Sequence, residues 1–403
     1  MVINIRTIFQ KIVLIGLILT PINGIFESYA LTFGSIVNTS TVEAPIYVKG
    51  IKDIVFGLCL ILGIIGLLNS KWRIGVFLAF FFYMTLLLSM VFSSFGNGYE
   101  HFLAGYRWVV PFILIFLVSK FIDLEFLLKC SKVLMKIFVV HFSLQITQLL
   151  FMQSFFYGVN NLGFSLRNPG FFLIPNTAGF FSITVLYFAL YFSDTSMATK
   201  WRFLIVTFIS SFLTASGTAL VAWFVIFCIW SVSSKNMKIC ILPITLLTTI
   251  FFSALGVITG RGPEYITISL GIRMEVFNEL LAKSDLFSDK FGFGTSTAYL
   301  MGIDGIVTDS TFAGLLVNSG LIGFLAIFFI LILTGLKSWI IGSRPALTMI
   351  LILFMYLATT SVPEAFPMNL LYALIVAYFA KFGLSERTLE RNFKQSEMIK
   401  KIC

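Results

Sequence analysis

Long apolar runs separated by short polar segments occupy most of the chain. About 20 consecutive apolar residues allow a helix to cross the hydrocarbon core of a membrane. The pattern therefore predicts an all-α polytopic integral membrane protein, with a single membrane domain over residues 1–403 and both termini on one side. The twelve predicted membrane-spanning helices are 12–31, 50–68, 74–93, 107–122, 133–153, 170–193, 203–215, 217–233, 238–258, 310–334, 346–361 and 366–382. The first run lacks a small-residue cleavage site, so we interpret it as a span and not as a cleavable signal peptide.

The apolar run from Phe203 to Ser231 allows two interpretations. It can form one kinked helix, or two short helices joined at the polar residues 214–218. We expect two helices, because a single one would move the basic C-terminal tail to the other side of the membrane. Twelve or thirteen residues reach only about 18–20 Å of a core that is about 30 Å thick. An irregular tip at that depth requires surrounding protein or water, so we also expect a water-filled cavity in the outer half of the bundle.

Residues 259–309 form the one long polar interruption, with seven carboxylates and four cations. Within it, apolar residues at helical spacing share one face: Ile272, Val276, Phe277, Leu280 and Leu281. Polar and charged residues lie away from that face. This pattern predicts a short amphipathic helix lying on or in the membrane surface. We expect the rest of the chain to hold this loop over one face of the membrane.

The composition supports a membrane protein and explains the charge. The chain is 58% hydrophobic and 11% charged with a mean hydropathy of +0.99, whereas soluble domains carry about 25% charged residues. If both termini are cytoplasmic, 20 of the 28 Lys and Arg residues fall on the cytoplasmic side. This bias follows the positive-inside rule, so the net charge of +10 needs no nucleic-acid partner. The loop 259–309 then faces outward. The five cysteines lie outside this loop and form no CxxC pair, so no disulfide framework or zinc site is expected.

Four arginines nevertheless fall on the outer side: Arg107, Arg167, Arg261 and Arg273. Each can be explained by a guanidinium that extends to the membrane interface. As a group they suggest binding of phosphate oxygens, because arginine presents a planar and permanently charged fork. An enzyme acting on a lipid-linked diphosphate needs such a grip, which also neutralises the departing diphosphate. The sequence contains no Walker loop, no GxSxG motif and no metal-ligand spacing of histidines or outward carboxylates, so we expect no metal ion.

Polar residues inside the predicted spans provide two further candidates. His141, Gln145 and Gln148 recur at helical spacing and share one face of the fifth span. They either line a cavity that binds sugar hydroxyls or form hydrogen bonds between helices, and we favour the second interpretation. Glu364 lies between Pro363 and Pro367 in a short outer loop, where it is either a solvated residue or a ligand of the cavity.

Several short stretches occur in a particular order along the chain. They are Arg167-Asn168-Pro169-Gly170 with Pro175-Asn176 and Gly179, then 213–218 (LTASGT), 271–273 (GIR), 292–294 (GFG), 308–312 (TDSTF) and 318–323 (NSGLIG). Together with the twelve spans, the outward arginines and the long outer loop, they resemble the O-antigen polymerases (Wzy-type) of the O-antigen ligase and polymerase superfamily.

The resemblance implies a metal-independent and cofactor-free glycosyltransferase of GT-C-like fold in the bacterial inner membrane. It would transfer the growing chain from undecaprenyl diphosphate to the non-reducing end of a new lipid-linked repeat unit on the periplasmic face. A chain-length regulator and a flippase are the implied partners in the same membrane. By analogy, Arg167 and Arg273 would hold the donor diphosphate. Some polymerases have ten residues between a loop arginine and a glycine. Here eleven separate Arg167 from Gly179 and nine separate Arg261 from Gly271, which leaves both Arg261 and Arg273 as candidates.

Asp309 is the candidate catalytic base. It lies where the outer loop re-enters the membrane, and a carboxylate at neutral pH can take the proton of an attacking sugar hydroxyl. The alternative is that Asp309 caps the tenth span. The related ligases carry a histidine at this position, which favours a polymerase over a ligase.

The other alternative function is a flippase or transporter of lipid-linked oligosaccharides. Such a protein should show a repeat between its halves, and the sequence shows none.

Overall fold

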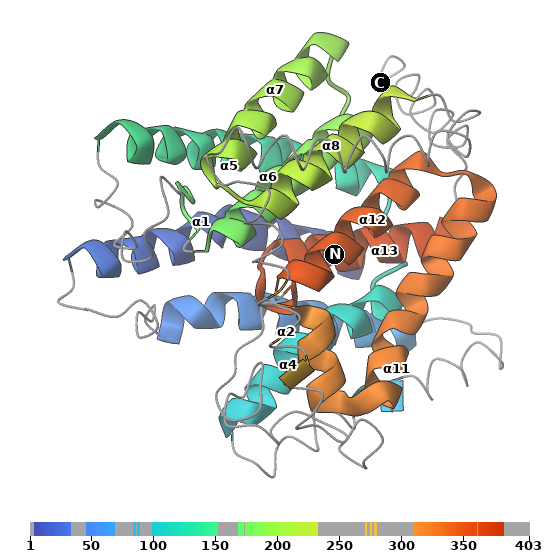
Figure 1. Ribbon diagram of the computed structural model, residues 1–403. Helices are drawn as coiled ribbons and strands as arrows, with labels where there is room; N and C mark the ends of the chain where they lie inside the picture. The colour runs from blue at the N-terminus through green and yellow to red at the C-terminus, as the bar shows by residue number, and fades with distance from the viewer. Residues whose placement is uncertain are drawn as a thin grey trace. The chain divides into compact units, whose positions relative to one another are not determined.

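The computed structural model describes residues 4–33, 46–68, 84–85, 87–88, 99–151, 168–172, 174–232, 271, 275, 278–279, 310–360 and 362–382. Within these ranges all regular secondary structure is helical, which confirms the predicted all-α class (Figure 1). The described α-helices are α1 (Ile5–Phe33), α2 (Ile46–Leu68), α4 (Tyr99–Leu117), α5 (Leu124–Phe151), α6 (Pro175–Tyr191), α7 (Met197–Leu213), α8 (Gly217–Ser231), α11 (Thr311–Ile341), α12 (Arg344–Thr359) and α13 (Met368–Phe382). A 3-10 helix, η4, covers Val362–Glu364.

These ten helices each overlap one of the twelve predicted spans. The other two predicted spans, 74–93 and 238–258, lie mainly outside the described residues. Within the described ranges, three helical segments are long and apolar enough to cross a membrane: Ile5–Ile22, Gly50–Leu68 and Leu124–Leu150. Shorter apolar helices accompany them, so the chain is a helical membrane protein, while the count of twelve spans stays a prediction.

Several helix boundaries differ from the predicted ones, among them the starts of α4, α5 and α6. Helix α5 begins at Leu124, well before the predicted residue 133, because Asp123 accepts a hydrogen bond of 2.8 Å from the backbone N–H of Phe126. An aspartate at this position satisfies a free donor at the helix start. Helix α6 begins at Pro175 and not at residue 170, because proline suits the first turn of a helix and a turn precedes it. Helix α4 begins at Tyr99, eight residues before the predicted start at Arg107.

The apolar run after Phe203 forms two helices, as predicted. Helix α7 ends at Leu213, helix α8 begins at Gly217, and the two pack against each other. Ala215 in the connecting turn has a φ of 49°, a left-handed conformation that stops the first helix. A single kinked helix is therefore wrong for this region.

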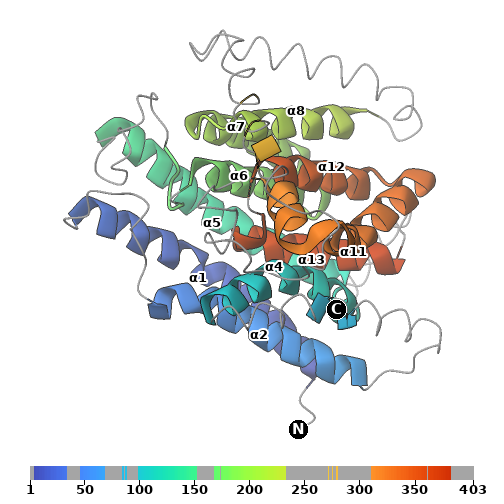
Figure 2. The ribbon, with the colours of Figure 1, turned by 60° about the horizontal axis from the view of Figure 1, so that its bottom comes forward.

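The chain divides into two compact units, which we describe separately. The first unit contains Met1–Leu62, Lys120–Ser231 and Ala365–Leu371. Its central helix is α6, which packs against α5, α7 and α8 (Figure 2). Fourteen of its seventeen residues are buried, from Pro175 to Leu190, so α6 is surrounded by protein. Helix α1 packs against α5 in the same unit.

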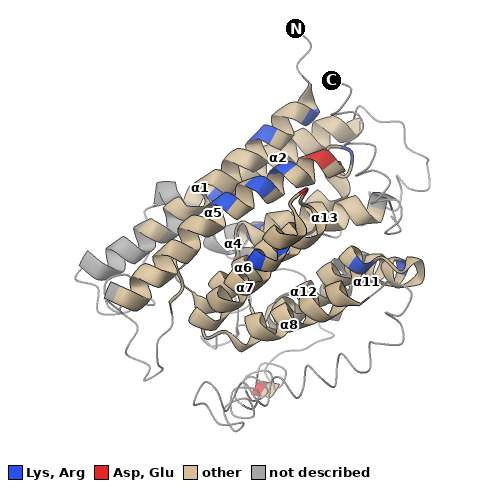
Figure 3. Ribbon diagram, turned by 90° about the horizontal axis from the view of Figure 1, so that it is seen from above, with Lys and Arg blue, Asp and Glu red and all other residues tan. Residues whose placement is uncertain are grey.

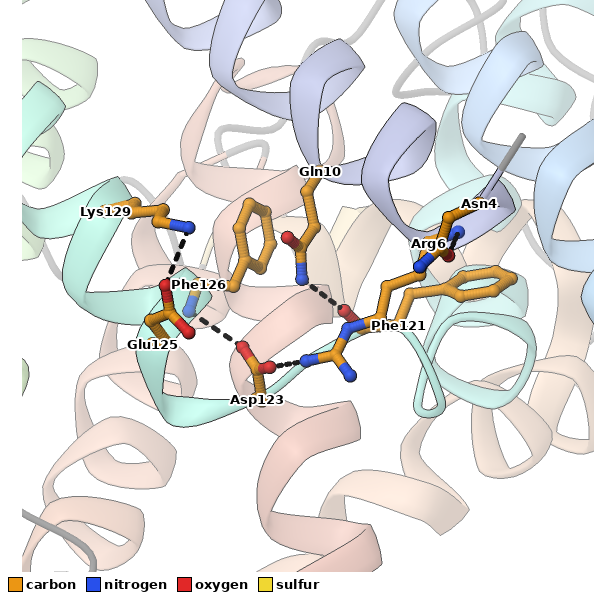
Figure 4. Close-up of polar contacts among 8 residues, drawn as sticks. All are labelled: Asn4, Arg6, Gln10, Phe121, Asp123, Glu125, Phe126 and Lys129. Carbon is orange, nitrogen blue, oxygen red and sulfur yellow. Dashed lines mark hydrogen bonds and ion pairs between the residues drawn. The ribbon is translucent and has the colours of Figure 1, made fainter. Parts of the chain in front are cut away.

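Polar contacts join the starts of α1 and α5 (Figure 4). Arg6 forms an ion pair with Asp123, and the Nε2 of Gln10 donates to the carbonyl of Phe121 at 3.0 Å. The ring of Phe9 packs against that of Phe121 with centroids 5.1 Å apart. These contacts place the N-terminus of α1 at the same end of the unit as the N-terminus of α5.

Cations gather at that end of α5 and α7. We call Lys129, Lys132, Lys136, Lys200 and Arg202 the basic end of the first unit. The Nζ of Lys132 contacts Asp194 at 3.1 Å, and that of Lys200 donates to the carbonyl of Leu190 at 3.1 Å. At the other end of these helices, the described residues of 144–151, 168–176 and 210–218 include no Lys or Arg. Figure 3 shows how few charges interrupt the otherwise uncharged helices.

The second unit contains Gly63–Ser119, Val232–Glu364 and Tyr372–Cys403. Helix α11 packs along α12, and α4 contacts η4. Four phenylalanine rings join α11 to α12: Phe312, Phe324, Phe328 and Phe354. Helix α11 ends at Ile341 and is followed by Gly342, whose φ of 75° is the left-handed conformation of a common helix C-cap.

Candidate functional site

The predicted polar face of α5 is buried against the turn that precedes α6. The exposed fractions of His141, Gln145 and Gln148 are 0%, 0% and 2%. Both glutamines bind the backbone of the turn at Asn168–Gly170, directly after Arg167. We call Gln145, Gln148, Asn168, Gly170 and Ser210 the amide junction.

Gln148 pairs with both backbone groups of Gly170. Its Nε2 donates to the Gly170 carbonyl at 2.8 Å, and its Oε1 accepts from the Gly170 N–H at 2.8 Å. A primary amide is the side-chain group that offers a donor and an acceptor side by side in this way. The pairing satisfies all the polar groups involved, which matters because an unpaired polar group buried in a membrane protein is costly.

Gln145 links the same turn to α7. Its Nε2 donates to the carbonyl of Asn168 at 2.9 Å and to that of Ser210 at 3.3 Å. The hydroxyl of Ser210 donates to the Oε1 of Gln145 at 2.6 Å and lies 2.8 Å from the hydroxyl of Ser182 on α6. One buried glutamine therefore connects α5, α7 and the turn before α6. The structure shows interhelical hydrogen bonding for Gln145, the interpretation favoured from the sequence.

Gly170 is required at its position for two reasons. Its φ is 64°, in the left-handed region that favours glycine. A Cβ at this residue would also overlap the imidazole of His141. The turn therefore lies directly on the histidine ring.

His141 is enclosed by aromatic rings. The centroids of Phe171, Phe181 and Phe172 lie 4.8, 5.3 and 5.6 Å from that of the imidazole. Neither ring nitrogen has a hydrogen-bond partner among the described residues. The contacts of His141 are thus with protein, and its role in substrate binding stays a prediction.

The tip between α7 and α8 closes over the same turn. The N–H of Asn168 donates to the carbonyl of Leu213 at 2.8 Å, and the hydroxyl of Ser216 donates to the Oδ1 of Asn176 at 3.0 Å. A Cβ placed on Gly179 would come within 2.7 Å of the Cβ of Ala219, so α6 and α8 approach each other closely here. The carbonyl of Leu213 at the tip is therefore satisfied by surrounding protein. The expected water-filled cavity stays a prediction.

In the second unit, the start of α11 is tied to the segment after α12. The hydroxyl of Thr311 donates to the carbonyl of Thr360 at 2.6 Å and accepts from the N–H of Val362 at 2.9 Å. The hydroxyl of Ser310 accepts from the N–H of Ala313 at 3.3 Å, which makes Ser310 the N-cap of α11. The N-cap position of α11 is therefore occupied by Ser310, while Asp309 lies outside the described residues and its role stays a prediction.

The other predicted site residues are placed as follows. Arg107 lies two turns inside α4 and is half-buried, because the polar residues 99–101 continue the helix beyond the apolar run. Its predicted place at the start of a membrane span stays a prediction. Glu364 is the last residue of η4, and its side chain is outside the described residues.

The side chains with the sharpest predicted roles, Arg167, Arg261, Arg273 and Asp309, also lie outside the described residues. In the loop 259–309, Gly271, Glu275, Asn278 and Glu279 are described and helical, and the last three are exposed. Within the described ranges, no three His, Cys, Asp or Glu side chains lie close enough together to hold a metal ion.

Sequence reasoning missed the partners of the two glutamines and the role of Thr311. The signals that could have found them are the Asn168-Pro169-Gly170 turn, whose backbone needs partners inside a membrane, and the Ser310-Thr311 pair at a helix start.

In comparisons with known proteins, no family model matches the chain and no curated protein is found to be similar.

Proposed function

We propose that this chain is a polymerase of O-antigen or of a related surface polysaccharide in the bacterial inner membrane. It transfers the growing chain from undecaprenyl diphosphate to the non-reducing end of a new lipid-linked repeat unit on the periplasmic face. It is a metal-independent glycosyltransferase and works beside a flippase and a chain-length regulator in the same membrane.

The observation that carries the proposal is the packing of the stretches on which the resemblance rests. Asn168, Asn176 and Gly179 are more than 35 residues away from Leu213, Ser216 and Ala219 in sequence. In the structure, Asn168 pairs with Leu213, Asn176 pairs with Ser216 and Gly179 lies against Ala219. Motifs that are weak singly therefore meet at one place, which supports a common site.

The position of the amide junction along α5, far from the basic end, supports a periplasmic site. Gln148 follows Lys129 by 19 residues on α5, which corresponds to about 28 Å along the helix axis. A hydrocarbon core is about 30 Å thick. With the basic end at the cytoplasmic surface, as the positive-inside rule requires, the amide junction lies near the opposite surface. Arg167 directly precedes that junction in sequence.

The proposed mechanism follows from the chemistry of these residue types. Arg167, with Arg273 or Arg261 from the outer loop, binds the donor diphosphate and neutralises the charge that develops as it departs. Asp309 accepts the proton of the acceptor hydroxyl while the new glycosidic bond forms at C1 of the donor sugar. Arg107 and Glu364 are assigned to substrate binding in the same proposal, and the buried His141 supports the turn that follows Arg167.

Replacing Arg167 in cells tests this function. We expect Arg167→Ala to abolish long-chain polysaccharide while lipid A-core capped with a single repeat unit remains, because the flippase and ligase still act. Arg167→Lys should restore little, since a point charge does not reproduce a bidentate fork. Lipopolysaccharide gels report the chain lengths, and membrane levels of the variants serve as the control. Full-length chains from the lysine variant would assign Arg167 to interfacial anchoring instead.

A further inference from the structure

The turn after Arg167 is held by side chains of another helix. Every backbone polar group from Asn168 to Gly170 has a partner in the structure. The N–H of Asn168 donates to Leu213, and the carbonyl of Pro169 accepts from Phe172. The other three groups, the carbonyl of Asn168 and both groups of Gly170, pair with Gln145 or Gln148.

We propose that Gln145 and Gln148 are positioning residues that set the backbone from which Arg167 approaches the diphosphate. This inference rests on the proposed function, because it assigns the two amides a task in donor binding. They act through the turn at Asn168–Gly170, and neither is proposed to touch the substrate.

Simple helix packing does not explain the choice of glutamine. Apolar residues of similar size would fill the same space in a membrane bundle without any polar group to satisfy. Thr147, on the same helix, shows the contrast: it is exposed and its hydroxyl bonds to the carbonyl of Ser143 in its own helix. Gln145 and Gln148 instead direct all their described hydrogen bonds to the turn and to Ser210. The hydrogen bonds of the two glutamines therefore fix the conformation of the turn at Asn168–Gly170 and also hold α5 and α7 together.

Aromatic packing also restrains the turn, on the side of Gly170 that faces His141. The His141 ring lies under Gly170, where a Cβ would overlap it, and the Phe171 ring packs edge-on against the imidazole at 4.8 Å. The two glutamine amides therefore hold the turn against the packed rings of His141 and Phe171. A shift of about 1 Å in a substrate-positioning element can reduce a rate by about 10²-fold.

Two isosteric variants, Gln148→Met and Gln145→Met, test the inference, with Thr147→Val as the matched control on α5. The first measurement is amide hydrogen exchange of the peptide covering 168–172 in purified protein, which does not depend on enzymatic activity. We expect Gln148→Met to speed exchange at Gly170 by roughly 5–10-fold, since the N–H of Gly170 loses its acceptor, the Oε1 of Gln148. Thr147→Val should leave exchange unchanged.

The second measurement is the rate of polymer formation from lipid-linked repeat units extracted from cells that lack this protein. We expect Gln148→Met to lose on the order of 10²-fold in rate, and Gln148→Met combined with Arg167→Lys to be no slower than Arg167→Lys alone, because the lysine variant has already lost the bidentate contact that the turn positions. The two glutamine variants remove different hydrogen bonds to the same turn. If one of them fails to reach the membrane, the other still tests the positioning role.

Faster exchange with an unchanged rate would overturn the positioning role, and so would unchanged exchange. An additive loss in the double variant would show that Gln148 acts independently of Arg167 and would also overturn it. A wild-type rate in Arg167→Ala alone would instead contradict the proposed role of the arginine, which separates failure of the inference from failure of the function.

Discussion

Gly170 is restricted both by its backbone conformation and by the packing around it. It needs a φ of 64° and leaves room for the His141 ring. We expect Gly170→Ala to lower the free energy of unfolding by roughly 2–5 kcal/mol, from left-handed strain of about 1–2 kcal/mol and overpacking of about 1–3 kcal/mol. Thermal unfolding in detergent measures this loss.

Two other glycines separate these effects. Gly342 has a φ of 75° but an open surrounding, so Gly342→Ala should show the strain alone, about 1–2 kcal/mol. Gly50 lies in α2 with a free surrounding and no unusual φ, so Gly50→Ala should stabilise the helix by about 0.5–1 kcal/mol. Equal losses for Gly170→Ala and Gly342→Ala would show that the contact with His141 is unimportant.

Asp309 and Ser310 are predicted to have separate roles, because Ser310 is the N-cap of α11. Asp309→Asn should leave the unfolding temperature unchanged and reduce the rate of polymer formation by on the order of 10²–10⁴-fold, since an amide cannot accept the proton. Ser310→Ala should do the reverse and cost about 1 kcal/mol of stability. Chain synthesis by Asp309→Asn at the wild-type rate would exclude the base role and direct attention to Glu275 or Asp304.

At the scale of elements, the close approach of α6 and α8 depends on small residues. Gly179 faces Ala219, and a Cβ at Gly179 would lie 2.7 Å from the Cβ of that alanine. We expect Gly179→Ala to destabilise the protein by about 1–3 kcal/mol through overpacking. Adding Ala219→Gly should recover part of this loss, because the clashing methyl group is removed. Purely additive losses in thermal unfolding of the double variant would show that the two residues do not limit the helix separation.

The helices were largely predictable from the sequence, and the polar contacts were not. Apolar length alone located α1, α2 and α11, and the charge bias together with the polar residues after Leu213 distinguished the α7–α8 hairpin from one helix. The start of α4 was missed because Tyr99, Glu100 and His101 are polar yet helical. Periodicity placed Gln145 and Gln148 on one face, but only the fold shows that this face meets Asn168 and Gly170. Such pairs are distant in sequence, and no local pattern encodes them.

At the scale of the whole molecule, the distribution of cations predicts the orientation in the membrane. The termini and the loops with most Lys and Arg residues should be cytoplasmic, and the loop 259–309 periplasmic. In a cysteine-free variant, cysteine introduced at Ser284 or Ser296 should react with an impermeant maleimide in intact spheroplasts. Cysteine at Ser234 or Ser396 should react only after lysis. Labelling at Ser234 in intact spheroplasts would contradict the predicted orientation of the segment that follows α8.

The synthesis of polymer by the purified protein tests the central claim most directly. The wild-type protein, in liposomes with lipid-linked repeat units as its only other component, should convert them into long chains and should do so in the presence of a divalent-ion chelator. Arg167→Ala protein at the same density should leave single units. Long chains from wild-type protein alone would establish a polymerase, whereas repeat units that cross the bilayer but stay single would contradict the proposal and identify a transporter.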